Sequence, residues 1–287
     1  MSFEKQNHHY VPQYWLRGFR GTGGRLYGLF GQNIKVVSTK SVMKRDFLYT
    51  IFDDQWNPSD ALEDALSVTE AEYAKLFQRL HTPGYSTTTR DRDQLCEALA
   101  LQASRHPDVL GRVHRLGKEL GNLLANVHSM ALDSFKREIA NFGINESDAH
   151  DAYIALTMHS KEKLACELDE LITLSPQSQQ LPEQIALLAA PQITDAIKKL
   201  EISLLVANPS EAFVLGDTPI PQSDLSGGFS VPLSKSLAAQ AIPTKTTQAT
   251  IPRRAASADE VESTNRIQSE NAAEVVVGPS AELLAKL

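Results

Sequence analysis

The chain has 287 residues, of which 42% are hydrophobic and 22% are charged, a balance typical of a globular protein with a sizeable core. Acidic residues outnumber basic residues by 35 to 28, and the formal net charge is −7. This charge excludes the globally basic surface of a sequence-independent DNA-binding protein. Any nucleic-acid contact must therefore be local, with RNA a better-suited partner than long duplex DNA.

The two cysteines and the N-terminus indicate the compartment. Cys96 and Cys166 lie far apart in helix-like segments, which predicts reduced core thiols rather than a disulfide framework. No basic region followed by an apolar run opens the chain, and no stretch approaches the roughly 18 apolar residues of a membrane helix. We expect a cytoplasmic protein with no membrane partner.

The most informative segment is residues 7–19, NHHYVPQYWLRGF, which combines paired histidines, an arginine and large aromatic residues. Most N-terminal segments are polar and frayed, whereas this one has enough apolar mass to dock into a core. Pro12 suits the first turn of a short helix, and Gly18 and Gly21 end it. The segment is therefore the best candidate for a functional site.

The expected elements follow in chain order. Turn signals flank Leu26–Phe30 and Ile34–Val37, which predicts a hairpin. Apolar residues at helical spacing predict a helix over Ala61–Leu80 and helical structure from Thr89 to about Asn141. Pro107 either kinks one long helix there or separates two. Further helices are expected over residues 146–172 and 182–199.

The periodicity changes at Leu200. Alternating apolar residues predict strands over 200–206, 213–215 and 229–233, followed by a loop over 244–258. A helix is expected over 260–273, and a final strand or helix end over 275–277. We predict an α+β fold in which helices dominate, with a small sheet formed by the N-terminal hairpin and C-terminal strands. A single domain is expected over 1–287, helical over about 59–199 and strand-rich over about 20–40 and 200–234.

Adjacent side chains alternate faces in an extended segment, so His8 and His9 cannot both reach one site. We favour His9 as a general base or acid, because imidazole titrates near pH 7. The alternative is that His9 hydrogen-bonds a backbone carbonyl while the neighbouring aromatic residues form core.

A second candidate is Arg105, which precedes Pro107 in an otherwise apolar helix. Its planar guanidinium suits a carboxylate or a phosphate, and the alternative is an ion pair with a structural glutamate. Glu63 and Glu70, seven residues apart, share a helix face; a solvated stripe is the favoured interpretation. His106 is interpreted as a surface histidine or one with satisfied hydrogen bonds.

A third candidate is Asp217, which a hydrophobic strand delivers into a tight turn. Its carboxylate suits a divalent metal ion or the orientation of a histidine. The alternative is an Asx-turn, in which the carboxylate accepts hydrogen bonds from local backbone donors.

Several enzyme classes are disfavoured by missing motifs. The His-His-x-x-Pro run resembles the first strand of ββα metal nucleases. Asn33 could supply the asparagine that follows in those enzymes, but the helical histidine is missing at short range, because the next histidine is His81. The chain also has no phosphate-binding P-loop, dinucleotide glycine fingerprint, Gly-x-Ser-x-Gly elbow or zinc-type cysteine spacing.

Four motifs together resemble a largely bacterial family known as domain of unknown function 4238. They are His9-Tyr-Val-Pro-Gln13-Tyr-x-Leu-Arg17-x-Phe19, Arg105-x-Pro107, Gly216-Asp217-x-Pro219 and Pro232-Leu-Ser234, and Asn265 and Ala272 match its closing pattern. The family usually has Ser where this chain has Gly216, and frequently Asn where it has Thr218. The family carries no established activity. The resemblance implies that His9, Gln13, Arg17, Arg105 and Asp217 share one pocket.

The leading hypothesis is a phosphodiester-cleaving, nuclease-like enzyme in a bacterial defence or toxin setting. His9 would be the general base or acid, and Asp217 would hold a divalent metal ion or orient His9. Gln13, Arg17 and Arg105 would bind substrate, with the two arginines neutralising phosphate charge. The alternative is a non-catalytic ligand-sensing or protein-interaction module in which the same residues form a structural polar network. A catalytic pocket requires an accessible His9 and Arg105, whereas a structural network should be closed.

Overall fold

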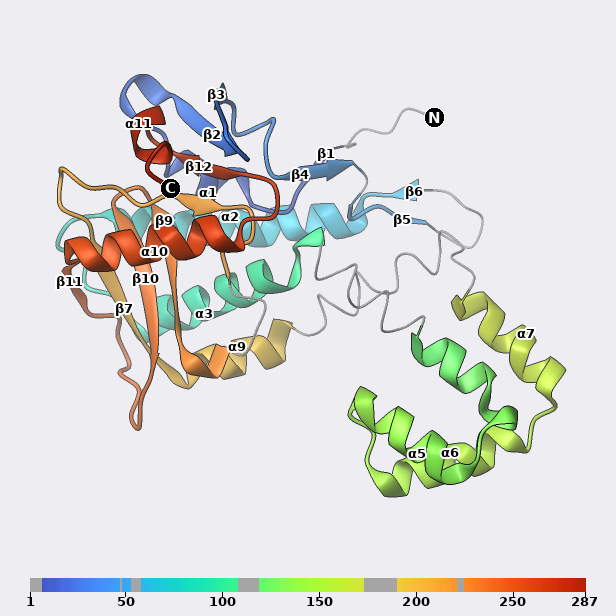
Figure 1. Ribbon diagram of the computed structural model, residues 1–287. Helices are drawn as coiled ribbons and strands as arrows, with labels where there is room; N and C mark the ends of the chain where they lie inside the picture. Colours follow the sequence, from blue (N-terminus) through green and yellow to red (C-terminus); the bar gives the residue numbers. More distant parts are fainter. Residues whose placement is uncertain (1–6, 47, 53–57, 108–118, 173–189, 221–224) are drawn as a thin grey trace. The chain divides into compact units, whose positions relative to one another are not determined.

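The computed structural model describes residues 7–46, 48–52, 58–107, 119–172, 190–220 and 225–287 (Figure 1). The contacts divide the chain into two compact units. Unit 1 comprises Met1–Thr50, Ser59–His106 and Leu187–Leu287, and unit 2 comprises Ile51–Pro58 and Pro107–Ala186. The single domain expected over residues 1–287 stays a prediction, because this division concerns contacts and not independent folding.

Unit 1 contains most of the regular structure. Its helices are α1 (Gln13–Arg17), α2 (Ala61–His81), α3 (Thr89–Ser104), α9 (Ala190–Lys198), α10 (Ala258–Asn271) and α11 (Ala281–Leu284), with 3-10 turns η1 (Thr22–Gly24) and η4 (Leu225–Gly227). Its strands are β1 (Asn7–His9), β2 (Leu26–Phe30), β3 (Asn33–Val37), β4 (Lys44–Asp46), β7 (Leu200–Val206), β8 (Leu215–Gly216), β9 (Phe229–Ser234), β10 (Leu237–Pro243), β11 (Arg253–Ala255) and β12 (Val276–Gly278). The predicted α+β class with dominant helices is confirmed.

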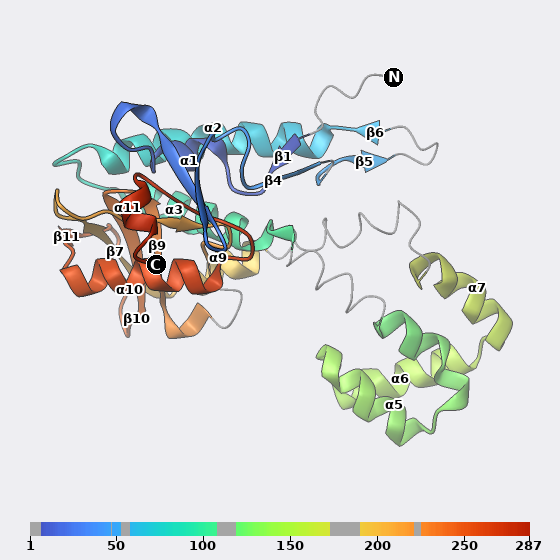
Figure 2. The same cartoon turned by 45° about the horizontal axis from the view of Figure 1, so that its top comes forward.

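Two four-stranded sheets organise unit 1. The first has the order β11-β7-β10-β9, in which β10 pairs antiparallel with both β7 and β9 while β11 runs parallel to β7. The second has the order β3-β2-β12-β8, with Val277 opposite Gly28 and Leu215. This second sheet joins the N-terminal hairpin to C-terminal strands, as predicted, and α11 packs on β2 and β12 (Figure 2).

The segment before α1 is also held by a strand pair. β1 pairs antiparallel with β4, so that His8 lies opposite Arg45 and His9 lies opposite Lys44. Trp15 of α1 is buried, and its indole Nε1 donates a 2.8 Å hydrogen bond to the carbonyl of Pro232 on β9. The N-terminal segment is therefore anchored to the C-terminal part of the chain.

The helices of unit 1 follow from their caps and apolar faces. Thr88 and Asp91 form a capping box at the start of α3, and Ser257 and Glu260 form one at the start of α10. α3 ends at Ser104, before Pro107, and residues 108–118 of the predicted continuation lie outside the described residues. Residues 182–189 of the helix predicted over 182–199 also lie outside them.

The described residues of unit 2 that follow Pro107 are helical, with α5 (Leu132–Ile139), α6 (Glu146–Thr157), α7 (Lys161–Ile172), and 3-10 turns η2 (Val127–Ser129) and η3 (Ala140–Phe142). Its buried core includes Phe135 and Ile139 of α5, Ala149 of α6 and Leu164 of α7. Short strands β5 (Ile51–Phe52) and β6 (Pro58–Ser59) form a two-stranded ladder. None of the helices in the described ranges is long and apolar enough to cross a bilayer.

Candidate functional site

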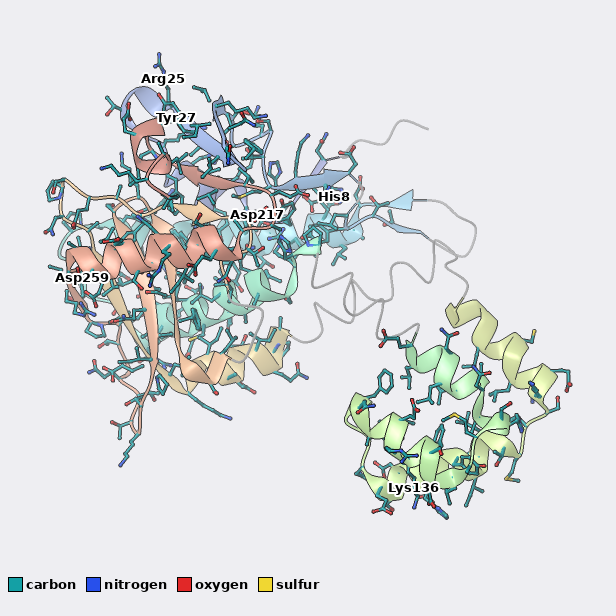
Figure 3. All side chains as sticks on the ribbon, in the orientation of Figure 1. His8, Arg25, Tyr27, Lys136, Asp217 and Asp259 are labelled. Carbon is teal, nitrogen blue, oxygen red and sulfur yellow. The ribbon has the colours of Figure 1, made fainter. Side chains whose placement is uncertain are left out.

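His8 and His9 differ in burial, as expected for neighbouring side chains that alternate faces along the extended strand β1. His8 is fully buried, its Nδ1 accepts a 2.7 Å hydrogen bond from the backbone N–H of Tyr49, and the two rings stack with centroids 5.7 Å apart. His9 is half-buried. Figure 3 shows His8 on β1 and Asp217 just beyond β8.

His9 makes the hydrogen bond of the alternative interpretation. Its Nε2 lies 3.0 Å from the carbonyl oxygen of Thr39, and because a carbonyl only accepts, Nε2 is the donor. Burial lowers the pKa of His9, and the nearby charges of Lys44 and Arg105 lower it further, while the hydrogen bond to Thr39 opposes them. The imidazole is therefore neutral at pH 7.

Arg105 is enclosed by protein. Its side chain is 2% exposed, and its guanidinium donates from Nη1 to Glu70 at 2.6 Å, from Nη2 to the carbonyl of His9 at 2.7 Å and from Nε to the Tyr49 hydroxyl at 3.1 Å. Tyr49 returns a 3.0 Å hydrogen bond to the carbonyl of Arg105. All three guanidinium nitrogens thus have protein partners, and none is directed to solvent.

The partner of Arg105 corrects one sequence interpretation. Glu70 does not belong to a solvated stripe, because it forms the ion pair with Arg105 and its side chain is only 23% exposed. Glu63, on the same face, has a buried Oε2. Burial raises the pKa of Tyr49, and burial together with the charge of Glu70 raises the pKa of Tyr14, so both phenols stay protonated. Nothing in the sequence singled out Tyr49, because it lies in a short irregular segment.

The two other residues predicted to bind substrate lie on α1. Gln13 is half-buried at its start and Arg17 is exposed at its end. Within the described residues, Arg17 has no ion pair or side-chain hydrogen bond. Of the five residues that the family resemblance places in one pocket, His9 and Arg105 are in direct contact.

Asp217 holds the chain segment that follows α10. Its carboxylate is fully buried and accepts hydrogen bonds from the backbone N–H groups of Ala273 at 2.8 Å, Glu274 at 2.8 Å and Val275 at 3.1 Å. These donors are more than fifty residues away, so the contact is not the local Asx-turn of the alternative interpretation. Burial raises the pKa of Asp217, against the effect of the backbone donors and of the nearby His106.

His106 links Asp217 to the N-terminal segment. Its ring meets the edge of the Tyr10 ring at a centroid distance of 5.1 Å, and its Nε2 lies 3.2 Å from the Thr218 hydroxyl. Gln102 donates a 2.9 Å hydrogen bond to the carbonyl of Tyr10. The prediction of a histidine with satisfied hydrogen bonds is confirmed for His106. The polar residues near residues 8–10 therefore act together to hold the backbone of that segment.

Three cations lie close to the half-buried His9 or to its partner Thr39, two of them exposed and one, Lys44, half-buried. Arg20 Nη2 lies 3.4 Å from the Thr39 hydroxyl, Lys40 is the next residue along the chain, and Lys44 lies opposite His9 in the β1–β4 ladder. We call His9, Arg20, Thr39, Lys40 and Lys44 the Thr39 cluster. Its cations are not neutralised by ion pairs within the described part of the chain.

Two further sequence expectations concern metals and thiols. Among the described residues, no group of three or more His, Cys, Asp or Glu side chains is arranged to hold a metal ion. Cys96 is a buried thiol, as predicted, and burial raises its pKa to about 11. Cys166 is exposed, so the prediction of a core thiol is wrong there.

The match to known families spans nearly the whole chain. The family model described as "Protein of unknown function (DUF4238)" matches residues 7–282. The chain belongs to this family. Searches of the curated proteins and of the solved structures return no match.

The structure shows why position 216 of this chain is a glycine. A Cβ added to Gly216 would lie 2.4 Å from the carbonyl oxygen of Gln268. The backbone N–H of Gly216 donates to Gln268 Oε1 at 3.0 Å, and Gln268 donates to the carbonyl of Pro219 at 2.9 Å. In this chain, α10 therefore approaches β8 too closely for a side chain at position 216.

Proposed function

We propose that this chain is a binding module for single-stranded nucleic acid, in which His9, Arg105 and Asp217 belong to a structural polar network. The observation that carries the proposal is that the buried charges of unit 1 have protein partners, whereas the cations of the Thr39 cluster form no ion pair with any described residue. Arg105 and Asp217 are 1% and 0% exposed and have protein partners. In the Thr39 cluster, Arg20 and Lys40 are exposed and Lys44 is half-buried. In this proposal, the polar network of Arg105 and Asp217 holds the N-terminal segment in place, and the Thr39 cluster on that segment binds the nucleic acid.

The charge of the N-terminal segment fits a phosphate-bearing partner. Residues 7–46 contain seven Lys or Arg residues and one acid, Asp46, although the whole chain has a net charge of −7. Arg45 is paired with Glu274, and the other cations remain available to phosphate. A local basic surface on an acidic protein favours a flexible single strand over a long duplex, because a duplex would approach the acidic remainder as well.

Salt dependence tests this proposal directly. Binding of a fluorescein-labelled single-stranded RNA is measured by anisotropy at several salt concentrations, for the wild type and for Arg20→Gln with Lys40→Gln and Lys44→Gln. Each phosphate contact contributes about 0.7 to the slope of log affinity against log salt, so the variant should lose about 2 from that slope. The matched control replaces three exposed cations elsewhere in unit 1, at Arg90, Lys245 and Arg266, and should keep the wild-type slope. Equal slopes in all three proteins would refute the proposal.

A second candidate function is phosphodiester cleavage in a bacterial defence or toxin setting. The observation favouring it is His9, which is half-buried beside Arg20 and Lys44 and stays neutral near pH 7, the form that a general base needs. Its Nε2 is engaged by Thr39, so base catalysis would use Nδ1 or would require that hydrogen bond to break. Growth arrest and RNA shortening by the wild type, lost in a folded His9→Ala protein, would establish this function.

A further inference from the structure

Unit 1 has a groove that neither the polar network nor the Thr39 cluster uses. It lies between α2, α3 and α9 and has a volume of about 480 Å³. Its apolar walls come from Leu62 and Leu66 of α2, Leu101 of α3 and Pro191 of α9. Small-molecule sites typically have volumes of about 300–1,000 Å³ and mostly apolar walls with a few polar groups, and this groove fits that description.

A tyrosine hydroxyl without a protein partner lines the groove. Tyr73 is 8% exposed, and within the described residues its hydroxyl has no hydrogen-bond partner. The hydroxyl oxygen is not fully buried, so a ligand in the groove can replace water as its hydrogen-bond partner. Burial and the charge of Glu97 raise the pKa of Tyr73 to about 12, so the hydroxyl stays neutral and can donate or accept a hydrogen bond.

The charges at the groove are predominantly negative. Glu97 of α3 and Asp195 of α9 both line it, and neither forms an ion pair with any described residue. The single cation of the lining, Lys198, has its Nζ 3.6 Å from Oδ1 of Asp93. The two carboxylates therefore remain to balance a positive charge carried by a ligand.

We propose that this groove binds a small organic amine, with its apolar body against Leu66 and Leu101 and its ammonium group facing Glu97 and Asp195. The Tyr73 hydroxyl accepts a hydrogen bond from the ammonium group. An ammonium group has three donors and no acceptor, which matches two carboxylates and a phenol oxygen. The apolar walls exclude water from the body of the ligand, and the carboxylates select its charge.

Three isosteric probes separate charge recognition from simple apolar burial. Benzylamine, benzyl alcohol and benzoate are titrated into the full chain with labelled leucine methyl groups, and the shifts of Leu66 and Leu101 are followed by NMR. Benzylamine should bind about fivefold more tightly than benzyl alcohol, since partly exposed charge pairs contribute up to about 1 kcal/mol, and benzoate should bind most weakly.

Substitutions in the groove test which side chains give the preference for the amine. Glu97→Gln with Asp195→Asn should remove the preference for the amine, whereas the matched control Asp259→Asn with Glu262→Gln, at exposed acids of α10, should keep it. Tyr73→Phe should weaken benzylamine more than benzyl alcohol. Equal binding of the three probes, tightest binding of benzoate, or no shift at Leu66 and Leu101 would each overturn the proposal. None of these variants alters the Thr39 cluster, so RNA binding is tested separately.

Discussion

Arg105 donates a 2.7 Å hydrogen bond to the backbone carbonyl of His9, joining residues 96 positions apart in the chain. The same guanidinium pairs with Glu70 and bonds Tyr49. One buried side chain thus fixes β1 against α2 and the end of α3. The N-terminal segment is therefore held by this contact in addition to its own buried aromatic residues.

Arg105→Ala should strongly destabilise unit 1. The substitution leaves Glu70, the Tyr49 hydroxyl and the His9 carbonyl without their shared donor, and breaking a buried ion pair typically costs about 3–5 kcal/mol. Urea unfolding followed by Trp15 fluorescence in a Trp56→Phe background measures the free energy of unfolding. Arg17→Ala, at an exposed position on α1, is the control and should change it by less than about 0.5 kcal/mol. Equal effects of the two substitutions would contradict the role given to Arg105.

Asp217→Asn keeps the size of the side chain but loses acceptor capacity. The three backbone N–H groups of residues 273–275 would meet one carbonyl oxygen and one amide group that itself donates. We expect a loss of about 2–3 kcal/mol in the free energy of unfolding, because buried donors are left unpaired. Asp259→Asn, in the exposed first turn of α10, is the control, and it should lower the free energy of unfolding by less than about 1 kcal/mol. A loss no larger than that of Asp259→Asn would show that Asp217 is not an anchor.

Asp91 should make stability depend on pH at low pH. Desolvation raises its pKa, but the combined hydrogen bonds from Thr88, Arg79 and Tyr85 outweigh it and lower the pKa to about 2. Because the pKa of Asp91 is lower in the folded state, its carboxylate stabilises the folded state at pH values above its unfolded-state pKa of about 4. This stabilisation is lost as the pH falls toward 2. The contribution is about 2 kcal/mol. Unfolding measured between pH 5 and pH 2 should show this loss in the wild type and a flatter profile in Asp91→Asn; parallel profiles would be inconsistent with the paired carboxylate.

Gly216→Ala should destabilise the packing of α10 on β8. The new Cβ would lie 2.4 Å from the carbonyl oxygen of Gln268, so the helix would have to shift, at a cost of about 1–3 kcal/mol. Gly227→Ala is the matched control, because a Cβ there has no heavy atom within 4 Å. Thermal unfolding of the two variants measures the difference, and equal midpoints would argue against the close approach.

The sequence predicts the elements whose local pattern is strong. Apolar spacing predicts α2 to within one residue, and the glycine-flanked runs predict the β2–β3 hairpin. β10 escapes prediction, because Leu237–Pro243 is rich in alanine and has few of the β-branched residues that mark strands. Its place in the sheet comes from pairing with β7 and β9, which a local pattern does not encode.

The sequence predicts which residues are candidates for the site, but it does not predict which partners they contact. Arg105 and His9 stand out by residue type, and alternation along β1 predicts that His8 and His9 face opposite ways but does not say which of them is buried. Their partners Glu70 and Tyr49 lie 35 and 56 residues from Arg105, and only the tertiary fold brings them together. The Thr39 cluster was hidden by the net charge, because the acids elsewhere in the chain outweigh the basic N-terminal segment.

The most direct test of a binding module with a structural polar network follows the fate of bound RNA. An end-labelled single-stranded RNA is incubated with the wild-type chain and Mg²⁺, and its mobility and its length are read on native and denaturing gels. The account predicts a shifted complex in which the RNA keeps its full length. Shortened RNA that becomes intact again with a folded His9→Ala protein would contradict it and assign catalysis to His9.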